Sequence, residues 1–438
     1  MSDIPVPSQH EVTREVADVP LRFPARRAWW IAFGIALALL SLFVVSVVHL
    51  LMNGPGIWGN NMPVNWGFPI FVYVWWLGLG HAGTLISALL LLLGQEWRNA
   101  LNRFAEAMTL CAVICAGIYP IIHLGRPWFL YWMFPYPATM GVWPQFRSPL
   151  EWDIWAVMTY LIVSAIFWYI GLVPDLATMR DRARSLAKKR IYGLFALGWR
   201  GQAIHWLCWK KLYRLMAAIA VPLVVSVHSE VSLLFAAGQI PGWHSTIYPP
   251  YFVLGAAFSG FAIVSMIAIV VRRAFHLEAL VTNRHLDLLG KVLLASGLMT
   301  AYGYVFEAFD ALYSGDAHEI GTLMDRVGGV YLWSYWGAII LNFLPLQGLW
   351  FARVRNSPLL LFLISASVMI GMWMERYMLL VTSLYQDFLP SSFGRYTPTF
   401  WDWSTYIGTL GLFLTPFLLF LRFIPSISMF EEKEIADG

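Results

Sequence analysis

Residues 28–52 read AWWIAFGIALALLSLFVVSVVHLLM, a run that contains no Asp, Glu, Lys or Arg. About 20 apolar residues cross the hydrocarbon core of a bilayer as a helix. The run is too long for the apolar core of a signal peptide, and no small-residue cleavage site follows it. We therefore expect a retained membrane-spanning helix, which makes the chain an integral membrane protein.

The composition of the whole chain agrees with this interpretation. Of its 438 residues, 59% are hydrophobic and only 12% are charged, whereas soluble domains carry about 25% charged residues. The 23 Trp and 19 Tyr suit two aromatic belts at the membrane interfaces. Cys111, Cys115 and Cys208 form no CxxC pair, so the sequence supports neither a disulfide framework nor a cysteine metal site.

Nine further runs are long and apolar enough to span the membrane. Backbone polar groups in lipid must bond within their own segment, so each run is expected to be a helix. The predicted fold is an all-α integral membrane protein with ten transmembrane helices. Their expected ranges are 28–52, 67–94, 104–125, 151–173, 211–239, 249–272, 286–313, 328–351, 357–385 and 401–423.

Cationic residues predict the orientation, because loops on the cytoplasmic side carry an excess of Lys and Arg. The N-terminal tail and every second loop hold Arg14, Arg22, Arg26, Arg27, Arg98, Arg103, the stretch MRDRARSLAKKR (179–190), Lys210, Lys211, Arg272, Arg273, Arg284, Arg353 and Arg355. The opposite loops hold only Arg126, Arg147, Arg326 and Arg395. Both tails, residues 1–27 and 424–438, are therefore predicted to be cytoplasmic in a multi-pass membrane protein.

A weak internal repeat predicts how the spans group. PIFVYVWWLGLGHAG (69–83) and PYFVLGAAFSGFAIV (250–264) each open a span that starts from the outer side and follows a Gly/Pro-rich loop with a Trp. The copies run in the same direction, unlike the inverted repeats of many transporters. We expect a first four-helix bundle at 67–239, a second at 249–385, and peripheral helices at 28–52 and 401–423.

Ionisable residues inside the spans are costly in lipid and are therefore candidates for function. They are His81, His123, Asp153, His228, Glu230, Glu307, Asp310, Glu375 and Arg376. At 1.5 Å per residue, most lie in the outer half of the membrane, and only His81 lies near the middle. The inner half shows few charges, so a continuous proton path is not evident from the sequence.

Each candidate also has a purely structural interpretation. Glu375 and Arg376 can form an internal salt bridge that packs their span, and each is expected to bond to a neighbouring helix. Glu307 and Asp310 can be exposed at the outer surface. His228 and Glu230 can bridge helices, and His81, flanked by glycines that permit close packing, can be satisfied by a neighbouring helix.

Three functional classes are less consistent with this pattern. Di-haem b-type bundles stack two histidines about four turns apart on one helix, and no span here carries such a pair; a single haem stays an alternative. A carrier would place its site near the midplane, whereas most candidates here lie toward the outside. An ion channel would need a ring of charges or carbonyls, and the sequence shows none.

Several stretches resemble the NrfD/polysulfide-reductase membrane-subunit family. They include GIWGNNMPVNWGFPIF (56–71), WWLGLGHAGTLISALLLLL (75–93), HLGRPWFLYWMFPYP (123–137), FRSPLEWDIWAV (146–157), PLVVSVHSEVS (222–232) and GMWMERYMLLVTSL (371–384). Within that family, the chain is similar to the quinol-binding membrane subunit of bacterial alternative complex III. The resemblance covers residues 55–402 and implies ten helices in two four-helix bundles, with no haem or iron–sulfur cluster in this chain.

The resemblance also implies a location in the bacterial inner membrane, a site and partners. The family's proposed quinol residues match His123, at the end of the third span, and Asp153, at the start of the fourth. The expected substrate is a quinol, either menaquinol or ubiquinol. Implied partners are a periplasmic iron–sulfur subunit, a second NrfD-like membrane subunit, multihaem and monohaem cytochrome c subunits, and a terminal oxidase; no nucleic acid is expected.

Quinol oxidation releases two electrons and two protons, so the site needs proton acceptors. His123 has a side chain that titrates near neutral pH, and Asp153 is expected to orient that imidazole and pass the proton onward. Arg126 is expected to hold Asp153 ionised or to contact the docked subunit, Trp128 to wall the quinone ring, and His81 to contribute to binding.

The remaining intramembrane charges suggest a separate hypothesis. His228, Glu230, Glu307, Glu375 and Arg376 are candidates for a proton pathway. Two alternatives for the whole chain stay open: a membrane anchor without catalysis, and the quinone-linked subunit of a reductase in which electrons run the other way.

Overall fold

The computed structural model describes residues 8–23, 26–134, 147–386 and 389–436, and this part of the chain is helical with no β-strand. Nine helices are long and apolar enough to span a membrane: α2 (Arg26–Asn53), α3 with its continuation (Phe68–Leu92), α5 (Asn102–His123), α6 (Pro149–Arg182), α8 (Ala203–Ala236), α9 (Tyr248–Ala274), α10 (Asn283–Ser314), α14 with its continuation (Pro358–Tyr385) and α16 (Phe400–Phe423). These nine confirm nine of the ten predicted spans.

The tenth predicted span, 328–351, is not one straight helix. It consists of α12 (Leu332–Phe343) and a 3-10 segment (Pro345–Trp350), and α11 (Ala317–Gly328) precedes it at a bend of 74°. Only the bent pair passes the length test for a span, which gives up to ten spans in the described residues. Pro345 at the start of the 3-10 segment has no N–H for a helical hydrogen bond, so α12 ends before it.

Shorter elements connect the spans. α1 (Gln9–Arg22), α7 (Leu186–Phe195), α13 (Ala352–Arg355) and α17 (Met429–Ala436) are helices, and α3 and α14 continue through π-helical turns at Leu85–Leu89 and Met378–Thr382 into α4 (Leu90–Leu92) and α15 (Ser383–Tyr385). Proline stands in the first turn of α3, α6, α9 and α14, where its missing N–H costs nothing.

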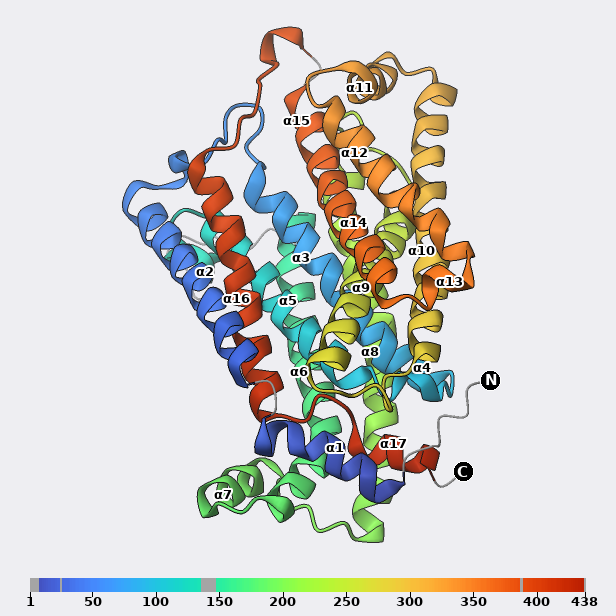
Figure 1. Cartoon of the computed structure of the whole chain (residues 1–438). Coiled ribbons are helices and arrows are strands. Elements are labelled where there is room, and N and C mark those ends of the chain that lie inside the picture. Colours follow the sequence, from blue (N-terminus) through green and yellow to red (C-terminus); the bar gives the residue numbers. More distant parts are fainter. Residues whose placement is uncertain (1–7, 24–25, 135–146, 387–388, 437–438) are drawn as a thin grey trace.

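Following the grouping predicted from the repeat, we call α3, α5, α6 and α8 the first bundle and α9, α10, α12 and α14 the second bundle (their arrangement is shown in Figure 1). In the first bundle, α3 packs on α5, and α6 packs on both α5 and α8. In the second bundle, α9 packs on α10 and α14, and α14 packs on α12. The first helices of the two groups, α3 and α9, lie against each other and join the bundles.

Glycine makes the α3–α9 junction possible. A Cβ atom on Gly260 of α9 would lie only 2.4 Å from the Cβ atom of Ala82 on α3. Any side chain at this position would push the two helices apart, so glycine permits the close approach. The junction falls within the two copies of the sequence repeat.

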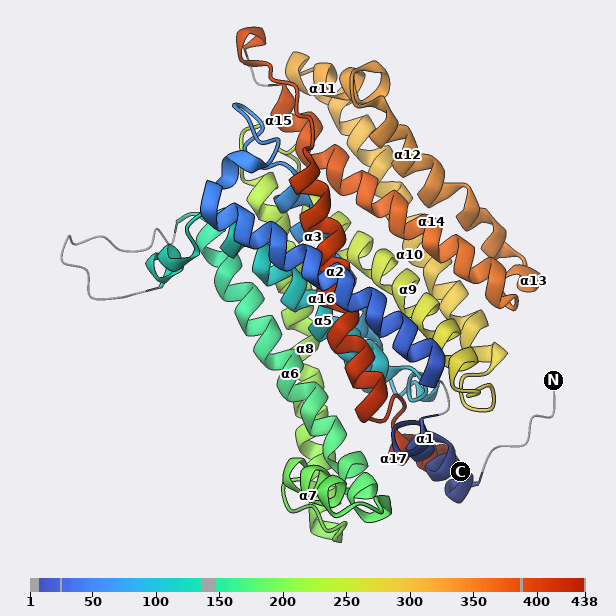
Figure 2. The same cartoon turned by 60° about the vertical axis from the view of Figure 1, so that its left-hand side comes forward.

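The peripheral helices form a pair of their own. α2 and α16 lie side by side in both views, and α16 contacts the first bundle through α5 and α3 (Figures 1 and 2). Ser46 on α2 and Ser404 on α16 are hydrogen-bonded at 2.8 Å inside this pair. The pair holds the first and last spans together on one flank of the molecule.

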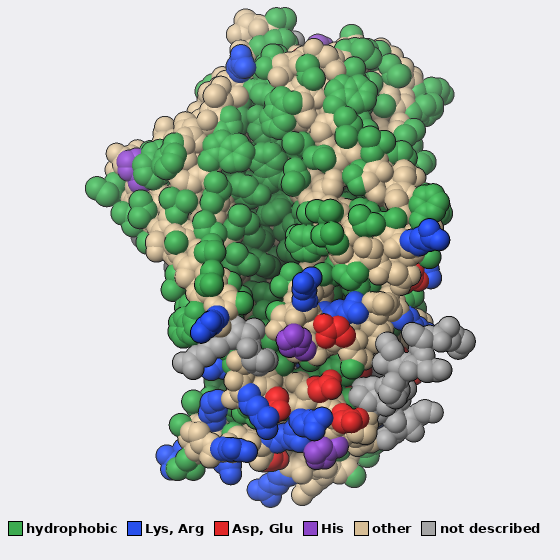
Figure 3. Space-filling model, viewed as in Figure 1, with side chains coloured by type: hydrophobic (Ala, Val, Ile, Leu, Met, Phe, Trp, Pro, Cys, Tyr) green, Lys and Arg blue, Asp and Glu red, His purple; other side chains and the backbone are tan. Residues whose placement is uncertain are grey.

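Both tails lie at one end of the molecule, where α1 contacts α17 (Figure 1). We call this the inner end, following the orientation predicted from the cations, and the opposite end the outer end. Charged side chains gather at the inner end, and the band above them is mostly hydrophobic (Figure 3). The molecule therefore shows the charge asymmetry that the sequence predicts, while the side that faces the cytoplasm stays a prediction.

Two cations assigned to an inner loop are in fact buried. Arg98 and Arg103 are 3% and 0% exposed, and both carry hydrogen bonds to carboxylates. A charge near the end of an apolar run can either lie in water or pair inside the protein, and hydropathy alone does not separate the two cases.

Candidate functional site

The Asp153 carboxyl lies where three helices of the first bundle meet. Asp153 is in the second turn of α6 and is 6% exposed. Its Oδ1 accepts a hydrogen bond of 2.5 Å from the hydroxyl of Tyr73 on α3. Glu230 of α8 faces Asp153 within hydrogen-bonding reach. The result is a pair of carboxyls with a tyrosine hydroxyl attached to one of them.

The Glu230 side chain depends on Asp153 for a polar neighbour. Both of its carboxyl oxygens are shielded from solvent, and no described donor gives either of them a hydrogen bond. Two carboxyls that face each other can share a proton between them. This geometry suits a group that receives a proton and passes it on.

His123 ends α5 at the outer end, next to the loop that precedes α3. Its ring lies 6.1 Å from the ring of Trp58, with an interplanar angle of 14°. The turn after His123 has Gly125 at φ 67°, and a Cβ atom there would lie 2.4 Å from Cγ of Pro55. Only glycine combines this backbone angle with such a close neighbour, so the loop at Pro55–Trp58 rests directly on the His123 turn.

Two buried nitrogen atoms at this position lack partners among the described residues. They are Nδ1 of His123 and Nε1 of Trp58. Buried polar atoms in proteins are normally hydrogen-bonded, and an exception needs an explanation. A ligand that carries a hydroxyl or carbonyl oxygen would supply the missing partner.

The predicted site residues do not all meet. No hydrogen bond joins His123 to Asp153 in the described part of the chain, so the expectation that Asp153 orients the imidazole is not supported by this arrangement. Arg126 is exposed and forms no ion pair with Asp153 within the same described residues, and the side chain of Trp128 is 58% exposed. Arg126 therefore does not hold Asp153 ionised through an ion pair, whereas its contact with a docked subunit and the role of Trp128 beside the quinone ring stay predictions.

Tyr73 and Trp58 are the residues that the sequence reasoning missed. Both lie in stretches that the repeat or the family resemblance singles out, but Tyr and Trp near the end of a span are typical of interfacial belts. A signal for Tyr73 was present: it lies eight residues before His81, hence about 12 Å nearer the outer end of the same span. That is the depth at which the sequence already placed Asp153.

His81 lies deeper in the same bundle. Its Nδ1 is 2.6 Å from the carbonyl oxygen of Leu77, and its ring lies 4.3 Å from that of His228 on α8 and 5.1 Å from that of Tyr160 on α6. All three side chains are buried. His81 therefore belongs to the polar interior of the bundle, below the Asp153 pair.

Polar groups continue from there toward the inner end. The Tyr160 hydroxyl donates to the Gly80 carbonyl at 3.0 Å and is hydrogen-bonded to Thr84. Further along, Arg103 pairs with Glu106 and with Asp175, each at 3.3 Å. The inner half of the first bundle is thus richer in buried charge than the sequence predicted.

The C-terminal helix closes this series at the inner end. Glu431 of α17 accepts hydrogen bonds from Arg98 and Asn102, and the Met429 N–H donates to Asp175 at 3.2 Å. The side chains of Arg98 and Glu431 are 4% and 5% exposed. We call the series from Asp153 to Glu431 the polar column of the first bundle.

The second bundle holds its own polar cluster. Glu307 pairs with Arg326 at 2.5 Å, and a cavity of about 10 Å³, the size of one water molecule, lies between this pair and Tyr304. Glu375 and Arg376 pair with each other at 3.1 Å. Glu307 is therefore not simply exposed at the outer surface, and Asp310 accepts a hydrogen bond of 3.2 Å from Ser245.

The five residues predicted as one proton pathway fall into these two groups. His228 and Glu230 belong to the first bundle, whereas Glu307, Glu375 and Arg376 belong to the second. The ring of Phe252 on α9 contacts both groups, with the Arg376 guanidinium 4.3 Å from its face and the His228 ring 5.9 Å away. No hydrogen bond joins the two groups in the described part of the chain, and a single path through all five stays a prediction.

The fold and site define a class: a multi-pass helical membrane protein with paired carboxyls and a histidine at one end of a four-helix bundle. In the described part of the chain, no group of three or more His, Cys, Asp or Glu residues is placed to hold a metal ion.

Comparison with known proteins shows to which family the chain belongs. Residues 56–386 match the family model described as polysulphide reductase, NrfD. The chain belongs to this family and is an NrfD-type integral membrane protein.

Two relatives match nearly the whole chain. One, from Halobacterium salinarum, is named provisionally as a membrane subunit of dimethyl sulfoxide reductase and is 24% identical over 91% of both chains. The other, a subunit of the selenate reductase of Mesobacillus selenatarsenatis, is 21% identical over 90% of this chain and 92% of its own length.

Proposed function

We propose that this chain is the quinol-oxidising membrane subunit of a respiratory oxidoreductase and that quinol reacts at the outer end of the first bundle. The observation that carries the proposal is the Asp153–Tyr73–Glu230 cluster, together with the unpartnered His123 nitrogen in the same outer region. Trp152 and Trp155 expose large apolar surfaces on α6 beside Asp153. A lipid-soluble substrate could therefore reach the site sideways from the bilayer.

The residues supply proton acceptors for the reaction. Oxidation of one quinol to quinone releases two electrons and two protons. His123 would accept a proton from one hydroxyl, and Asp153, held in place by Tyr73, would accept the other and share it with Glu230. The electrons would leave to an iron–sulfur subunit docked over the outer end, and the protons would leave on that side.

The central test is Asp153→Asn in the purified complex. The amide keeps the size of the side chain but cannot accept a proton, so quinol oxidation should fall by a factor of about 10² or more. Turnover is measured with a soluble quinol and an artificial acceptor. Asp310→Asn, the same change near the outer end of the second bundle, should retain wild-type turnover.

The same experiment tests the alternative that the chain is a membrane anchor without catalysis. An anchor predicts no quinol binding and wild-type electron transfer in Asp153→Asn. Co-purification of the partner subunits shows that the variant complex is assembled. Wild-type turnover in an assembled Asp153→Asn complex would therefore rule out our assignment.

The electron acceptor separates two forms of the proposal. Sequence resemblance favours alternative complex III, in which electrons pass through cytochrome c subunits. The names of the two relatives favour a terminal reductase. Both forms oxidise quinol. The purified complex distinguishes them: quinol-dependent reduction of cytochrome c supports the first, and quinol-dependent reduction of dimethyl sulfoxide or selenate supports the second.

A second activity, proton transfer across the membrane, is favoured by the polar column. The column is a series of buried ionisable groups from Asp153 near the outer end to Glu431 at the inner end, with His228, His81 and the Arg103 cluster between them. His228 has no hydrogen-bond partner among the described residues, so proton transfer through the column would need water molecules or side-chain motion. Intramembrane ionisable groups are retained at a cost and often form proton relays. We propose that the first bundle, rather than the second, takes up protons from the inner side during turnover.

A further inference from the structure

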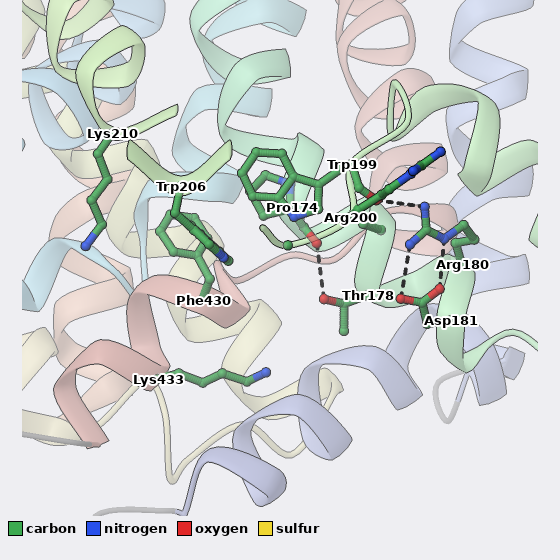
Figure 4. Close-up of a pocket in the computed structure, with 12 residues that line it drawn as sticks. Pro174, Thr178, Arg180, Asp181, Trp199, Arg200, Trp206, Lys210, Phe430 and Lys433 are labelled. Atoms are coloured by element: carbon green, nitrogen blue, oxygen red, sulfur yellow. Dashed lines mark hydrogen bonds and ion pairs between the residues drawn. The ribbon is translucent and has the colours of Figure 1, made fainter. Parts of the chain in front are cut away.

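A separate cavity lies at the inner end, away from the polar column. It has a volume of about 440 Å³ and lies between α6, the segment that connects α7 to α8, the start of α8, and α17 (Figure 4). Its lining combines aromatic side chains, Trp199, Trp206 and Phe430, with the cations Arg180, Arg200, Lys210 and Lys433.

The cavity carries a clear excess of positive charge. Among the described residues of its lining, Asp181 is the one carboxylate, against four cations. Asp181 binds the Arg180 guanidinium at two points, 2.8 and 3.2 Å, and Arg180 also donates to the Trp199 carbonyl at 3.0 Å. Arg180 is thereby fixed and largely neutralised, and the cavity keeps a net positive charge to which Arg200 and Lys433 contribute.

Cations lie on both sides of the aromatic side chains in the cavity. In the view of Figure 4, Lys210 lies to the left of the aromatic side chains of Trp206 and Phe430, and Arg180 lies to the right. Lys433 is half-buried beside them, and its burial lowers the pKa of its ammonium group. An anion in the cavity would favour the charged form of this lysine.

The cavity lies at the level of lipid headgroups. Arg180 is 27 residues after Asp153 on one continuous helix, hence about 40 Å along its axis. The hydrocarbon core is about 30 Å thick, so Arg180 lies just beyond its inner boundary. Ile204 and Leu207, near Trp206 at the start of α8, are 58% and 60% exposed and offer apolar surface to acyl chains.

We propose that this cavity binds the phosphate headgroup of an anionic phospholipid. The cations would contact the phosphate, the aromatic residues would pack against the glycerol backbone, and the acyl chains would follow α8 into the bilayer. Basic pockets between helices on the cytoplasmic side are suited to anionic headgroups. Since Phe430 and Lys433 belong to α17, a bound lipid would also hold the C-terminal helix against α6 and α8.

The test measures binding of phosphatidylglycerol to the purified, delipidated complex by native mass spectrometry. Arg200→Gln combined with Lys433→Gln should weaken binding by about 25-fold, because each cation near an anionic headgroup contributes a factor of about five. The matched control is Lys189→Gln with Arg190→Gln on α7, which removes the same charges outside the cavity. This control should bind phosphatidylglycerol like the wild type.

Two further ligands identify the source of the phosphate. The headgroup of phosphatidylcholine carries the same phosphate but has no net charge, because its choline group is cationic. It should bind at least tenfold more weakly than phosphatidylglycerol. Inorganic phosphate should not compete at millimolar concentration. Equal loss in the cavity variant and the control, unchanged binding in the cavity variant, or competition by inorganic phosphate would overturn the proposal. Quinol turnover is not the readout, so failure here is distinguishable from failure of the proposed function.

Discussion

At the scale of single residues, Tyr73 is the group that fixes the geometry of the site. It is 1% exposed, and its hydroxyl makes the one hydrogen bond that Asp153 receives from a described side-chain donor. Hydrogen bonds to charged groups contribute about 1.5–3 kcal/mol. In the proposed reaction Tyr73 does not react with quinol itself; it holds the Asp153 carboxyl that would accept the proton.

We predict that Tyr73→Phe lowers kcat for quinol oxidation by about 10- to 100-fold, the rate equivalent of losing such a bond. The ring still fills its space, so the complex should assemble. The pH–rate profile of the variant should shift as well, because the acid group titrates without its donor. A merely structural tyrosine would leave that profile unchanged.

Tyr119→Phe provides the control for this prediction. Tyr119 is equally buried, but its hydroxyl bonds to Thr409 at 3.2 Å, between α5 and α16. This substitution removes a buried hydroxyl without touching the Asp153 cluster. Equal losses in both variants would mean that Tyr73 only supports packing.

The sequence could predict part of this site and not the rest. Resemblance directed attention to His123 and Asp153, and helical depth placed them both near the outer end. The contacts of Asp153 with Tyr73 and Glu230 depend on how α3, α6 and α8 rotate against one another. That rotation is decided by packing, which one sequence does not reveal.

At the scale of elements, α17 packs over the inner end of the first bundle. Its Glu431 is buried against Arg98, while Glu432, one residue further, is half-buried beside it. Burial and the neighbouring Glu431 raise the pKa of Glu432 to about 8. The helix therefore carries a carboxyl that the folded state prefers to keep protonated.

This raised pKa predicts a pH dependence of stability. The unfolded carboxyl titrates near its ordinary pKa of about 4.5, so the folded state binds more protons between about pH 4.5 and 8. The contribution of Glu432 to the free energy of unfolding is then present below about pH 4.5 and is lost as the pH rises toward 8.

Thermal unfolding of the complex at pH 5 and at pH 8 measures this effect. The Glu432→Gln variant should lose less stability than the wild type as the pH rises over this interval, because its side chain does not titrate. Glu96→Gln, at an exposed position of the inner end, should keep the wild-type pH dependence. Parallel pH curves for Glu432→Gln and the wild type would contradict the prediction.

Elements were easier to predict than their ends. The length of each apolar run predicted a long span, because a helix must be apolar over the thickness of the hydrocarbon core. It did not give the inner extensions of α6 to Arg182 and of α8 back to Ala203, because helices outside lipid need no apolar run. Nor did it give the bend between α11 and α12, because the hydropathy of a segment does not report its direction.

At the scale of the whole molecule, the two bundles contain separate polar interiors. The ring of Phe252 contacts both His228 in one and Arg376 in the other. Neither ring nitrogen of His228 has a hydrogen-bond partner in the described part of the chain, so no hydrogen bond joins the two interiors at this point. The bundles can therefore be tested one at a time.

Proteoliposomes that contain the complex provide this test, with pH recorded on both sides during quinol oxidation. Glu106→Gln, in the polar column, should reduce proton uptake from the inner side per electron while quinol turnover continues. Glu375→Gln, in the second bundle, should leave proton uptake unchanged. If the wild type takes up no protons from the inner side, or if only Glu375→Gln affects uptake, the first bundle is not the path.

The pairing of α2 with α16 has a consequence for biosynthesis. These helices are residues 26–53 and 400–423, so α2 leaves the ribosome long before the helix against which it packs. At translation rates of about 5–20 residues per second, α2 would wait on the order of 20–70 seconds in the membrane before its partner exists. During that interval it is accessible to insertion factors and to membrane proteases, and a chain that stops before residue 400 never covers it.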